Sequence, residues 1–123
     1  MIGHNYLGLF GRNTGTIYGL KLDNIYVKGY DKTGALIGQN NGSGVVKGIW
    51  LTGDTLGNTD VGGLVGYNYG TITSVKVTGN VTTTGPESGL IAGCNYGNGT
   101  GRVGQIEAVA KGNITSSYNG TPH

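Results

Sequence analysis

The segment Gly62–Ile72 reads GGLVGYNYGTI, and the five residues Gly66–Gly70 at its centre form the pattern Gly-x-Asn-x-Gly. The same pattern recurs in this 123-residue chain, at Gly11–Gly15, Gly38–Gly42 and Gly93–Gly97. The central asparagines of the four copies are 27, 28 and 27 positions apart. A fixed period in this range is the signature of a repeat architecture, in which each unit is one supersecondary element. The repeat therefore decides the fold.

Each unit holds short β-prone segments between glycine-rich corners and has no helical periodicity. A unit of this size cannot bury its own apolar face, so successive units must stack. We predict an all-β protein, a parallel β-solenoid of about four coils of ~27 residues with three short strands per coil. The predicted coils, within a single domain 1–123 that is part of a longer chain or an assembly, are approximately 6–32, 33–60, 61–87 and 88–115, followed by a tail at 116–123.

Stacking in register places equivalent residues of successive coils in ladders. One apolar ladder is expected at Leu9, Leu36, Leu64 and Ile91, and a second at Ile17, Val46, Ile72 and Ile106. The motif asparagines should form a third, polar ladder, Asn13, Asn40, Asn68 and Asn95. An asparagine amide both donates and accepts hydrogen bonds, so it can satisfy backbone groups at a corner and bond to the next asparagine. We interpret this ladder as structural.

Composition excludes several classes of function. The chain has 8 basic and 6 acidic residues, a net charge of +2, and a single cysteine. Its basic residues are too few and too scattered for a nucleic-acid interface. Apolar runs are too short to insert in a membrane, and one cysteine gives neither an internal disulfide nor a cysteine-based zinc site. No secretion signal is recognisable in this chain.

Tyrosines supply the candidate binding residues. Tyr67, Tyr69 and Tyr96 flank the ladder asparagines and should share one outward face with polar residues of other coils. Tyrosine combines apolar area with a hydrogen-bonding tip, which suits carbohydrate or protein contacts. Stacking that only stabilises neighbouring coils is the alternative. The candidate binding set is Tyr67, Tyr69, Tyr96, Gln39, Asn41 and Arg102.

Catalytic chemistry is not expected. The two histidines, His4 and His123, sit near the chain ends, and no zinc-protease motif is present. Cys94 has no histidine placed to activate it. The acidic residues Asp31 and Asp60 fall near equivalent places in adjacent coils and are interpreted as solvated corner groups. We predict no catalytic residue, no metal site and no cofactor.

The Gly62–Ile72 stretch resembles the GLUG motif, a run like Gly-Gly-Leu-Val-Gly followed by Asn, Gly and Ile, and the other three copies match more loosely. The resemblance covers about residues 6–115. It implies a secreted or surface-attached bacterial protein, since such repeats resemble those of adhesin-like proteins and immunoglobulin A1 proteases. It carries over no catalytic residue.

These observations favour a non-catalytic structural or adhesive module of a bacterial extracellular or cell-surface protein. A carbohydrate- or host-protein-binding module using the tyrosine face is one alternative. Open coil ends are unpaired strand edges, so another alternative is a subunit of an end-to-end stacked fibre. The expected partners are flanking solenoid repeats or further copies of the chain, with a glycan or host surface protein in the binding alternative.

Overall fold

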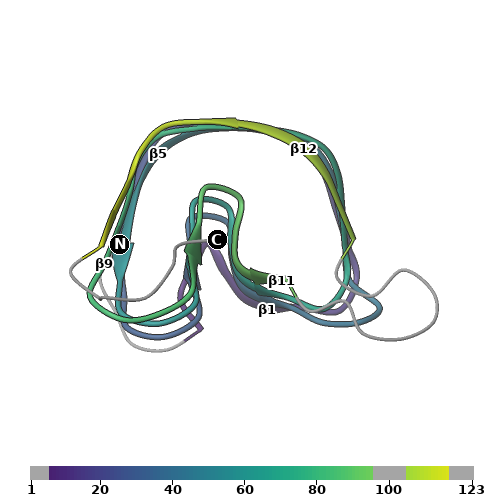
Figure 1. The fold of residues 1–123 in the computed structure, drawn as a ribbon. Helices are drawn as coiled ribbons and strands as arrows, with labels where there is room; N and C mark the ends of the chain where they lie inside the picture. The colour runs from purple at the N-terminus through teal and green to yellow at the C-terminus, as the bar shows by residue number, and fades with distance from the viewer. Residues whose placement is uncertain (1–5, 96–104, 117–123) are drawn as a thin grey trace.

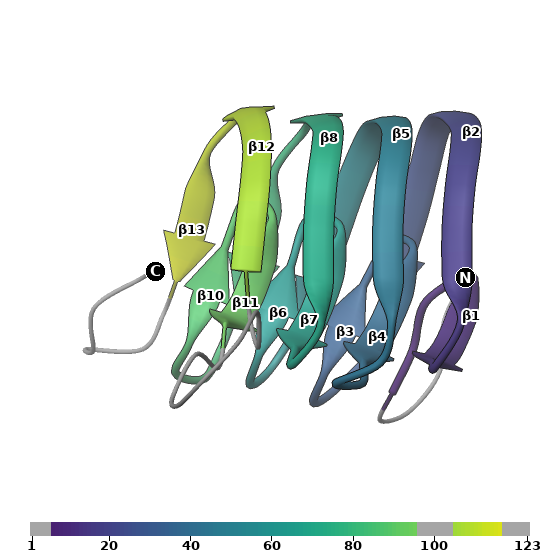
Figure 2. The same cartoon turned by 90° about the vertical axis from the view of Figure 1, so that its right-hand side faces the viewer.

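The computed structural model describes residues 6–95 and 105–116 and, of the side chains in the second range, those of 110–114. All regular structure in these ranges is β, and every strand pair is parallel. Figure 1 looks along the axis of the solenoid, and Figure 2 shows its coils side by side. No helix in the described ranges has the length and apolar character needed to cross a membrane.

The strands follow one another in the same order in successive coils. Their bounds are β1 (Phe10–Asn13), β2 (Thr16–Lys28), β3 (Thr33–Gly34), β4 (Ile37–Asn40), β5 (Val45–Gly57), β6 (Val61–Gly62), β7 (Val65–Asn68), β8 (Thr71–Thr78), β9 (Val81–Thr83), β10 (Ser88–Gly89), β11 (Ala92–Asn95), β12 (Gln105–Lys111) and β13 (Ile114–Ser116).

Stacking of equivalent strands generates three sheets. The asparagine sheet has the order β1-β4-β7-β11, and the inner sheet has the order β3-β6-β10. The convex sheet contains β2, β5, β8 and β12 together with β9 and β13. In Figure 1 the convex sheet arches over the other two, which fold inward beneath it. Each coil therefore has an arched cross-section with an inward fold on one side.

The predicted parallel β-solenoid is confirmed, but it has about three turns where the sequence suggested about four coils. The asparagine sheet has four strands, whereas the inner sheet has only three. At the inner-sheet position of the first coil, Leu7 makes only an isolated bridge to Thr33. The strands at the two ends thus belong to incomplete turns, which a count of motifs cannot distinguish from complete ones.

The division of each coil into strands also differs from the prediction. The second and third predicted β-segments of a coil lie in one sheet: β2 and β5 each run unbroken for 13 residues. In the next coil β8 and β9 both pair with β5. The bend between these segments contains Gly53, Gly79 and Gly112, and a Cβ built on Gly79 would lie 1.6 Å from the Gly53 carbonyl oxygen. Glycine lets the sheet bend here because no side chain fits between the coils.

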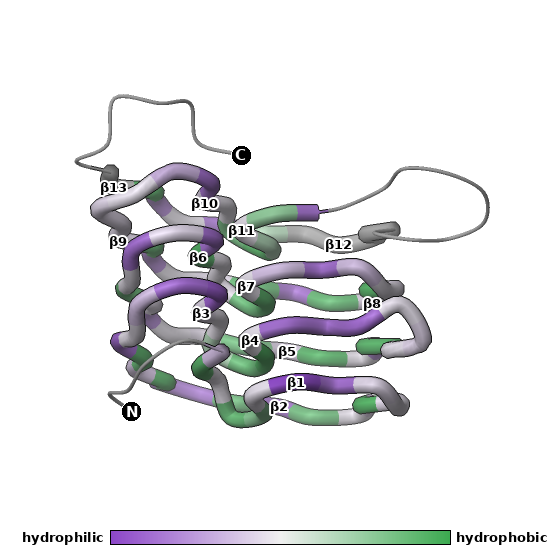
Figure 3. Tube along the Cα trace, turned by 90° about the horizontal axis from the view of Figure 1, so that it is seen from below, coloured by the Kyte–Doolittle hydropathy of each residue, from purple (hydrophilic) through white to green (hydrophobic). Residues whose placement is uncertain are grey.

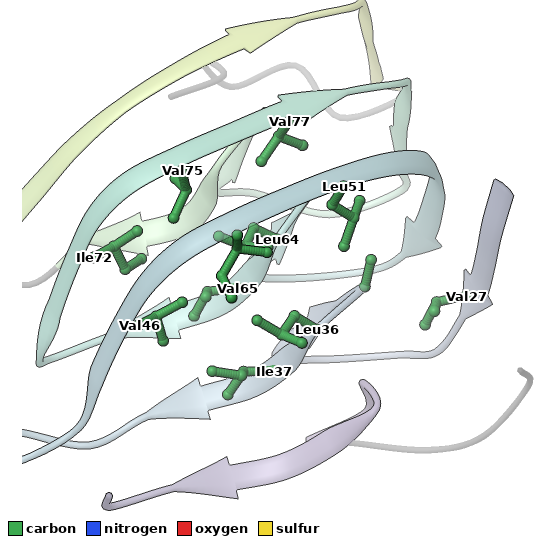
Figure 4. Close-up of a cluster of buried hydrophobic side chains, with 12 residues drawn as sticks. Val27, Leu36, Ile37, Val46, Leu51, Leu64, Val65, Ile72, Val75 and Val77 are labelled. Atoms are coloured by element: carbon green, nitrogen blue, oxygen red, sulfur yellow. The ribbon is translucent and has the colours of Figure 1, made fainter. Parts of the chain in front are cut away.

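The core lies between the convex sheet and the two inward-folded sheets (Figure 4). Backbone register confirms the ladder of Ile17, Val46, Ile72 and Ile106. In the other predicted ladder, Leu36 and Leu64 are fully buried, but Leu9 is 49% exposed. Leu9 lies in the first coil, where no earlier coil covers it among the described residues. Burial in this fold therefore depends on having a neighbour on both sides.

Candidate functional site

The asparagine ladder lies in single file along the asparagine sheet. The Nδ2 atoms of Asn13, Asn40 and Asn68 each donate to the Oδ1 atom of the asparagine in the next coil, at 2.9 Å in all three steps. Asn40 and Asn68 are fully buried. Figure 3 shows the polar colour recurring at this place in successive coils.

The first three ladder amides also bond to the corner that follows them. Asn13 and Asn68 donate to the carbonyl two residues further on, and Asn40 donates to the carbonyl of Gly44. Gly15 and Gly70 return a backbone N–H to the asparagine side chain. Both amide hydrogens and the carbonyl oxygen of these three residues thereby have partners within the fold, which supports a structural role.

The sequence-predicted binding residues divide into two groups. Tyr96 and Arg102 lie outside the described residues. Gln39 and Tyr67 occupy equivalent positions in the column that runs through Arg12, Gln39, Tyr67 and Cys94. Asn41 and Tyr69 flank the ladder on its other side.

The side chains of this predicted face mostly contact one another. The rings of Tyr67 and Tyr69 are tilted against each other with centroids 4.7 Å apart, and both residues are half-buried. Gln39 donates to Asn41 Oδ1 at 2.7 Å. The structure thus brings four of the six predicted residues to one side of the solenoid, where the two tyrosine rings lie in tilted contact.

A column that sequence reasoning missed lies beside them, at the entry to the inner sheet. Tyr6, Lys32, Asp60 and Glu87 all have a left-handed backbone, with φ between 52° and 63°. Non-glycine residues rarely adopt this conformation, and here it recurs once per coil. The signal was present in the sequence, because each residue stands two positions before a glycine (Gly8, Gly34, Gly62 and Gly89).

Asp60, at 5% exposure, is not the solvated corner group that the sequence suggested. Asp60 is equivalent to Lys32, and Asp31 lies one position earlier. The Asp31 carboxylate accepts hydrogen bonds from the Asn58 side chain and the Thr59 amide at 3.2 Å. Asp31 is therefore a corner-capping residue of the neighbouring coil.

Lys32 links this column to the tyrosines. Its Nζ atom lies 4.0 Å from Asp60 Oδ2, and it lies 5.4 Å and 5.3 Å from the ring centroids of Tyr6 and Tyr67. The Arg12 guanidinium stacks over the Tyr6 ring at 4.1 Å. Cations and aromatic rings from successive coils therefore alternate along this side.

Asp60 is the buried acid of the site. It is 5% exposed, and its Oδ1 atom has no hydrogen-bond partner among the described residues. Burial, followed by a hydrogen bond with Glu87 and the negative charge of that residue, raises the pKa of Asp60 to about 7, while Lys32 acts in the opposite direction. The Asp60 carboxyl therefore keeps its proton until the pH approaches about 7.

Cys94 completes a cluster with these two acids. One carboxylate oxygen of each acid and the Cys94 sulfur lie within 4.8 Å of one another. Burial and the charge of Glu87 raise the pKa of Cys94 to about 11, so its thiol stays protonated at neutral pH and is a weak nucleophile. Hydrogen bonding with Tyr69, together with burial, raises the pKa of Tyr67.

Chemically, this cluster can hold protons more readily than it can attack a substrate. The three donor atoms are of the types that bind zinc once deprotonated, but the Lys32 ammonium already supplies a positive charge to the Asp60 carboxylate. Both histidines of the chain lie outside the described residues.

Comparison with known proteins bears on the central coils. Residues 57–82 match the family model of the GLUG motif. This central segment is thus similar to the GLUG motif. Gly57 pairs with Thr83 in the next coil, so the matched GLUG segment spans one full turn of the solenoid. No curated protein and no solved structure matches the chain.

Proposed function

We propose that this chain is a non-catalytic structural module, a stalk, spacer or adhesive segment of a bacterial extracellular or cell-surface protein. One observation carries the proposal: a ladder of asparagine amides, buried at Asn13, Asn40 and Asn68, runs through all four strands of the asparagine sheet, with every step at 2.9 Å. A GLUG motif and a solenoid fold fit a structural repeat module. The extracellular and adhesive roles rest on the family resemblance.

The direction of the hydrogen bonds between coils determines how the module carries load. Backbone and side-chain hydrogen bonds between coils all lie along the solenoid axis, so a pull along this axis loads many of them together. Among the described residues, each coil contacts mainly its neighbours, as in other repeat proteins. Such a module transmits force along its axis and can be lengthened by adding coils.

Single-molecule pulling between the chain ends tests this function. We expect resistance followed by stepwise extension, in which each coil of ~27 residues releases roughly 90 Å of chain. An Asn40→Asp variant, which breaks the ladder in mid-solenoid, should lower the force of the first step. Smooth extension of the wild-type chain without steps would refute a load-bearing role.

End-to-end association has its own supporting observation. Leu9 and Phe10 in the first coil are 49% and 41% exposed, and Leu20, Leu22 and Ile25 of β2 are only partly buried. The outer edges of β1 and β2 pair with no other described strand. A further coil, from flanking repeats or a second copy, would extend both sheets and cover these side chains. Sedimentation of wild type and Phe10→Lys tests this, and a concentration-independent wild-type monomer would contradict self-association.

Glycan or host-protein binding by the tyrosine face is the remaining alternative. Tyr67 and Tyr69 keep part of their ring surface accessible. A glycan array tests this alternative. Binding by wild type that disappears in Tyr67→Ala, with the fold retained, would indicate ligand recognition and not a scaffold function.

A further inference from the structure

The outward face of the convex sheet carries a second set of aromatic residues, away from the asparagine sheet. Backbone register aligns two adjacent columns on β2, β5 and β8: Tyr18, Lys47 and Thr73 in one, and Lys21, Trp50 and Lys76 in the other. Tyr18 is 69% exposed and Trp50 is 52% exposed. The sequence pattern gave no prominence to these positions, because different residue types occupy the same repeat position.

Three lysines surround the two rings. The Nζ atoms of Lys21 and Lys76 lie 5.8 Å and 5.0 Å from the Trp50 ring centroid, one from each neighbouring coil. Lys47 Nζ lies 5.8 Å from the Tyr18 ring centroid. All three lysines are exposed. We call these five residues the Trp50 platform.

The platform carries positive charge that the described side chains do not neutralise. The ion pair found among those side chains joins Lys32 to Asp60, so no described carboxylate lies within ion-pair distance of these three lysines. Two acidic positions lie nearby. Asp23 follows Lys21 by two residues and accepts a hydrogen bond from Thr52 at 3.4 Å, and Glu107 pairs with Thr73 by backbone register.

The surface beside Trp50 is hollowed. A shallow hollow of about 310 Å³ is lined by Gly48, Ile49, Trp50, Ser74, Val75 and Lys76. Gly48 and Ser74 are equivalent residues with a left-handed backbone, at φ 64° and 54°. The small residues at this bulge border a hollow beside the half-exposed indole, so a flat group can approach it.

We propose that the Trp50 platform binds an acidic polysaccharide, a chain of sugar rings that carry carboxylate or sulfate groups. The apolar face of a sugar ring would stack on the indole, and the anionic groups would pair with the lysine ammonium groups. Charge complementarity selects the acidic class, because three ammonium groups that no described carboxylate neutralises attract anions and repel cations. Parallel rungs about 4.8 Å apart place Lys21, Lys47 and Lys76 on three successive coils, a spacing that suits a linear polyanion.

This site is independent of the proposed scaffold function and of the tyrosine face. A purely structural reading assigns the lysines to stabilising neighbouring coils through their contacts with the ring. The two readings differ in what lysine removal changes: a binding site loses affinity, whereas a coil-stabilising contact loses stability.

Trp50 makes the test direct, because it is the only tryptophan of the chain and its fluorescence reports on the platform alone. The probes are oligogalacturonate, which carries carboxylates, and sulfated dextran oligomers, with neutral dextran oligomers of equal length as the uncharged arm. We expect a saturable change in fluorescence with an acidic probe, weakened by salt, and none with the neutral oligomers. The carboxylate and sulfate arms then distinguish the two anionic groups.

Variants distinguish binding from stabilisation. Lys21→Gln with Lys76→Gln should lower the affinity at least tenfold while leaving the unfolding midpoint unchanged. Lys28→Gln, an exposed lysine on the same strand β2, is the matched control and should bind as wild type. Binding to Trp50→Ala, which lacks the fluorophore, is measured by calorimetry. This variant should lose binding while its circular dichroism spectrum stays that of wild type.

Three results would overturn the proposal. The first is no binding of either acidic probe at physiological salt, and the second is equal binding of neutral and acidic oligomers. The third is a double lysine variant that binds as wild type or weakens no more than the Lys28→Gln control.

Discussion

Truncating one buried rung of the asparagine ladder, Asn40→Ala, has a cost that follows from the structure. Asn40 accepts one hydrogen bond from Asn13 and donates two, to Asn68 and Gly44. Each bond contributes about 1 kcal/mol net, so their loss should lower the free energy of unfolding by about 3 kcal/mol.

The partners of Asn40 limit this cost to the bonds themselves. Asn13 still donates to Gly15, and Asn68 still accepts from the Gly70 amide. The Gly44 carbonyl still accepts from Thr71. Each of these groups keeps at least one hydrogen bond. The larger penalty for a buried polar group that has lost every partner therefore does not apply.

Asn40→Asp keeps the volume of the side chain but removes its hydrogen-bond donors, so it isolates the effect of the hydrogen bonds from the loss of volume in Asn40→Ala. A carboxylate can still accept from Asn13, but it cannot donate to Asn68 or Gly44, and it places a buried charge against two oxygen atoms. Its pKa in the folded protein must therefore rise above the unfolded value of about 3.9. Stability is then lost as the pH rises from about 4 through the folded pKa. We expect Asn40→Asp to be less stable than Asn40→Ala at pH 7 and to recover toward pH 4.

Urea unfolding followed by circular dichroism measures these differences, with each variant compared with wild type at the same pH. Hydrogen exchange gives a local measure, because the Asn41 and Tyr69 amides bond across the ladder at 2.9 Å and 2.8 Å and should lose protection first. Asn95→Ala is the matched control: Asn95 is exposed and accepts one bond from Asn68. The reasoning is refuted if Asn40→Ala costs no more than Asn95→Ala, or if Asn40→Asp is not relatively more stable at low pH.

Three further predictions concern other parts of the solenoid. Because the pKa of Asp60 is raised to about 7, wild type should lose up to about 4 kcal/mol of stability between pH 4 and 7. Asp60→Asn should flatten most of that slope, and the exposed Asp23→Asn should not. Gly79→Ala should cost more than about 3 kcal/mol in urea unfolding, whereas Gly42→Ala, with open space around it, should cost far less. Cys94, with a pKa of about 11, should alkylate slowly at pH 7 and speed up until about pH 11; rapid labelling at neutral pH would contradict its burial.

The inward fold of the inner and asparagine sheets explains why part of the candidate site escaped the sequence analysis. Tyr67 and Gln39 could be aligned from the repeat, since both stand one position before a ladder asparagine. The contact of Asp60 and Glu87 with Cys94 could not, because the two acids share one position of the repeat and Cys94 occupies another. Only the path of the chain between two columns brings them within 4.8 Å.

The Trp50 platform shows the same division. The alignment of its residues in two columns can be predicted from the repeat alone. In a parallel in-register sheet, residues that are one period apart in the sequence become neighbours in space. Whether Lys21 and Lys76 extend toward the indole, and whether the indole lies open beside a hollow, depends on side-chain packing at the bulge of Gly48 and Ser74.

Sequence by itself determined the periodic properties of this protein: a parallel β-solenoid, the in-register ladder of Asn13, Asn40, Asn68 and Asn95, and the ladder of Ile17, Val46, Ile72 and Ile106. A repeated segment that cannot bury its apolar side alone must stack on its own copies, and stacking fixes which residues become neighbours. Tertiary structure decided the cross-section of each coil, including the merging of two predicted segments into the convex sheet and the left-handed column through Lys32 and Asp60. The cross-section depends on how sharply the backbone bends within a coil, and periodicity along the chain carries no information about that angle.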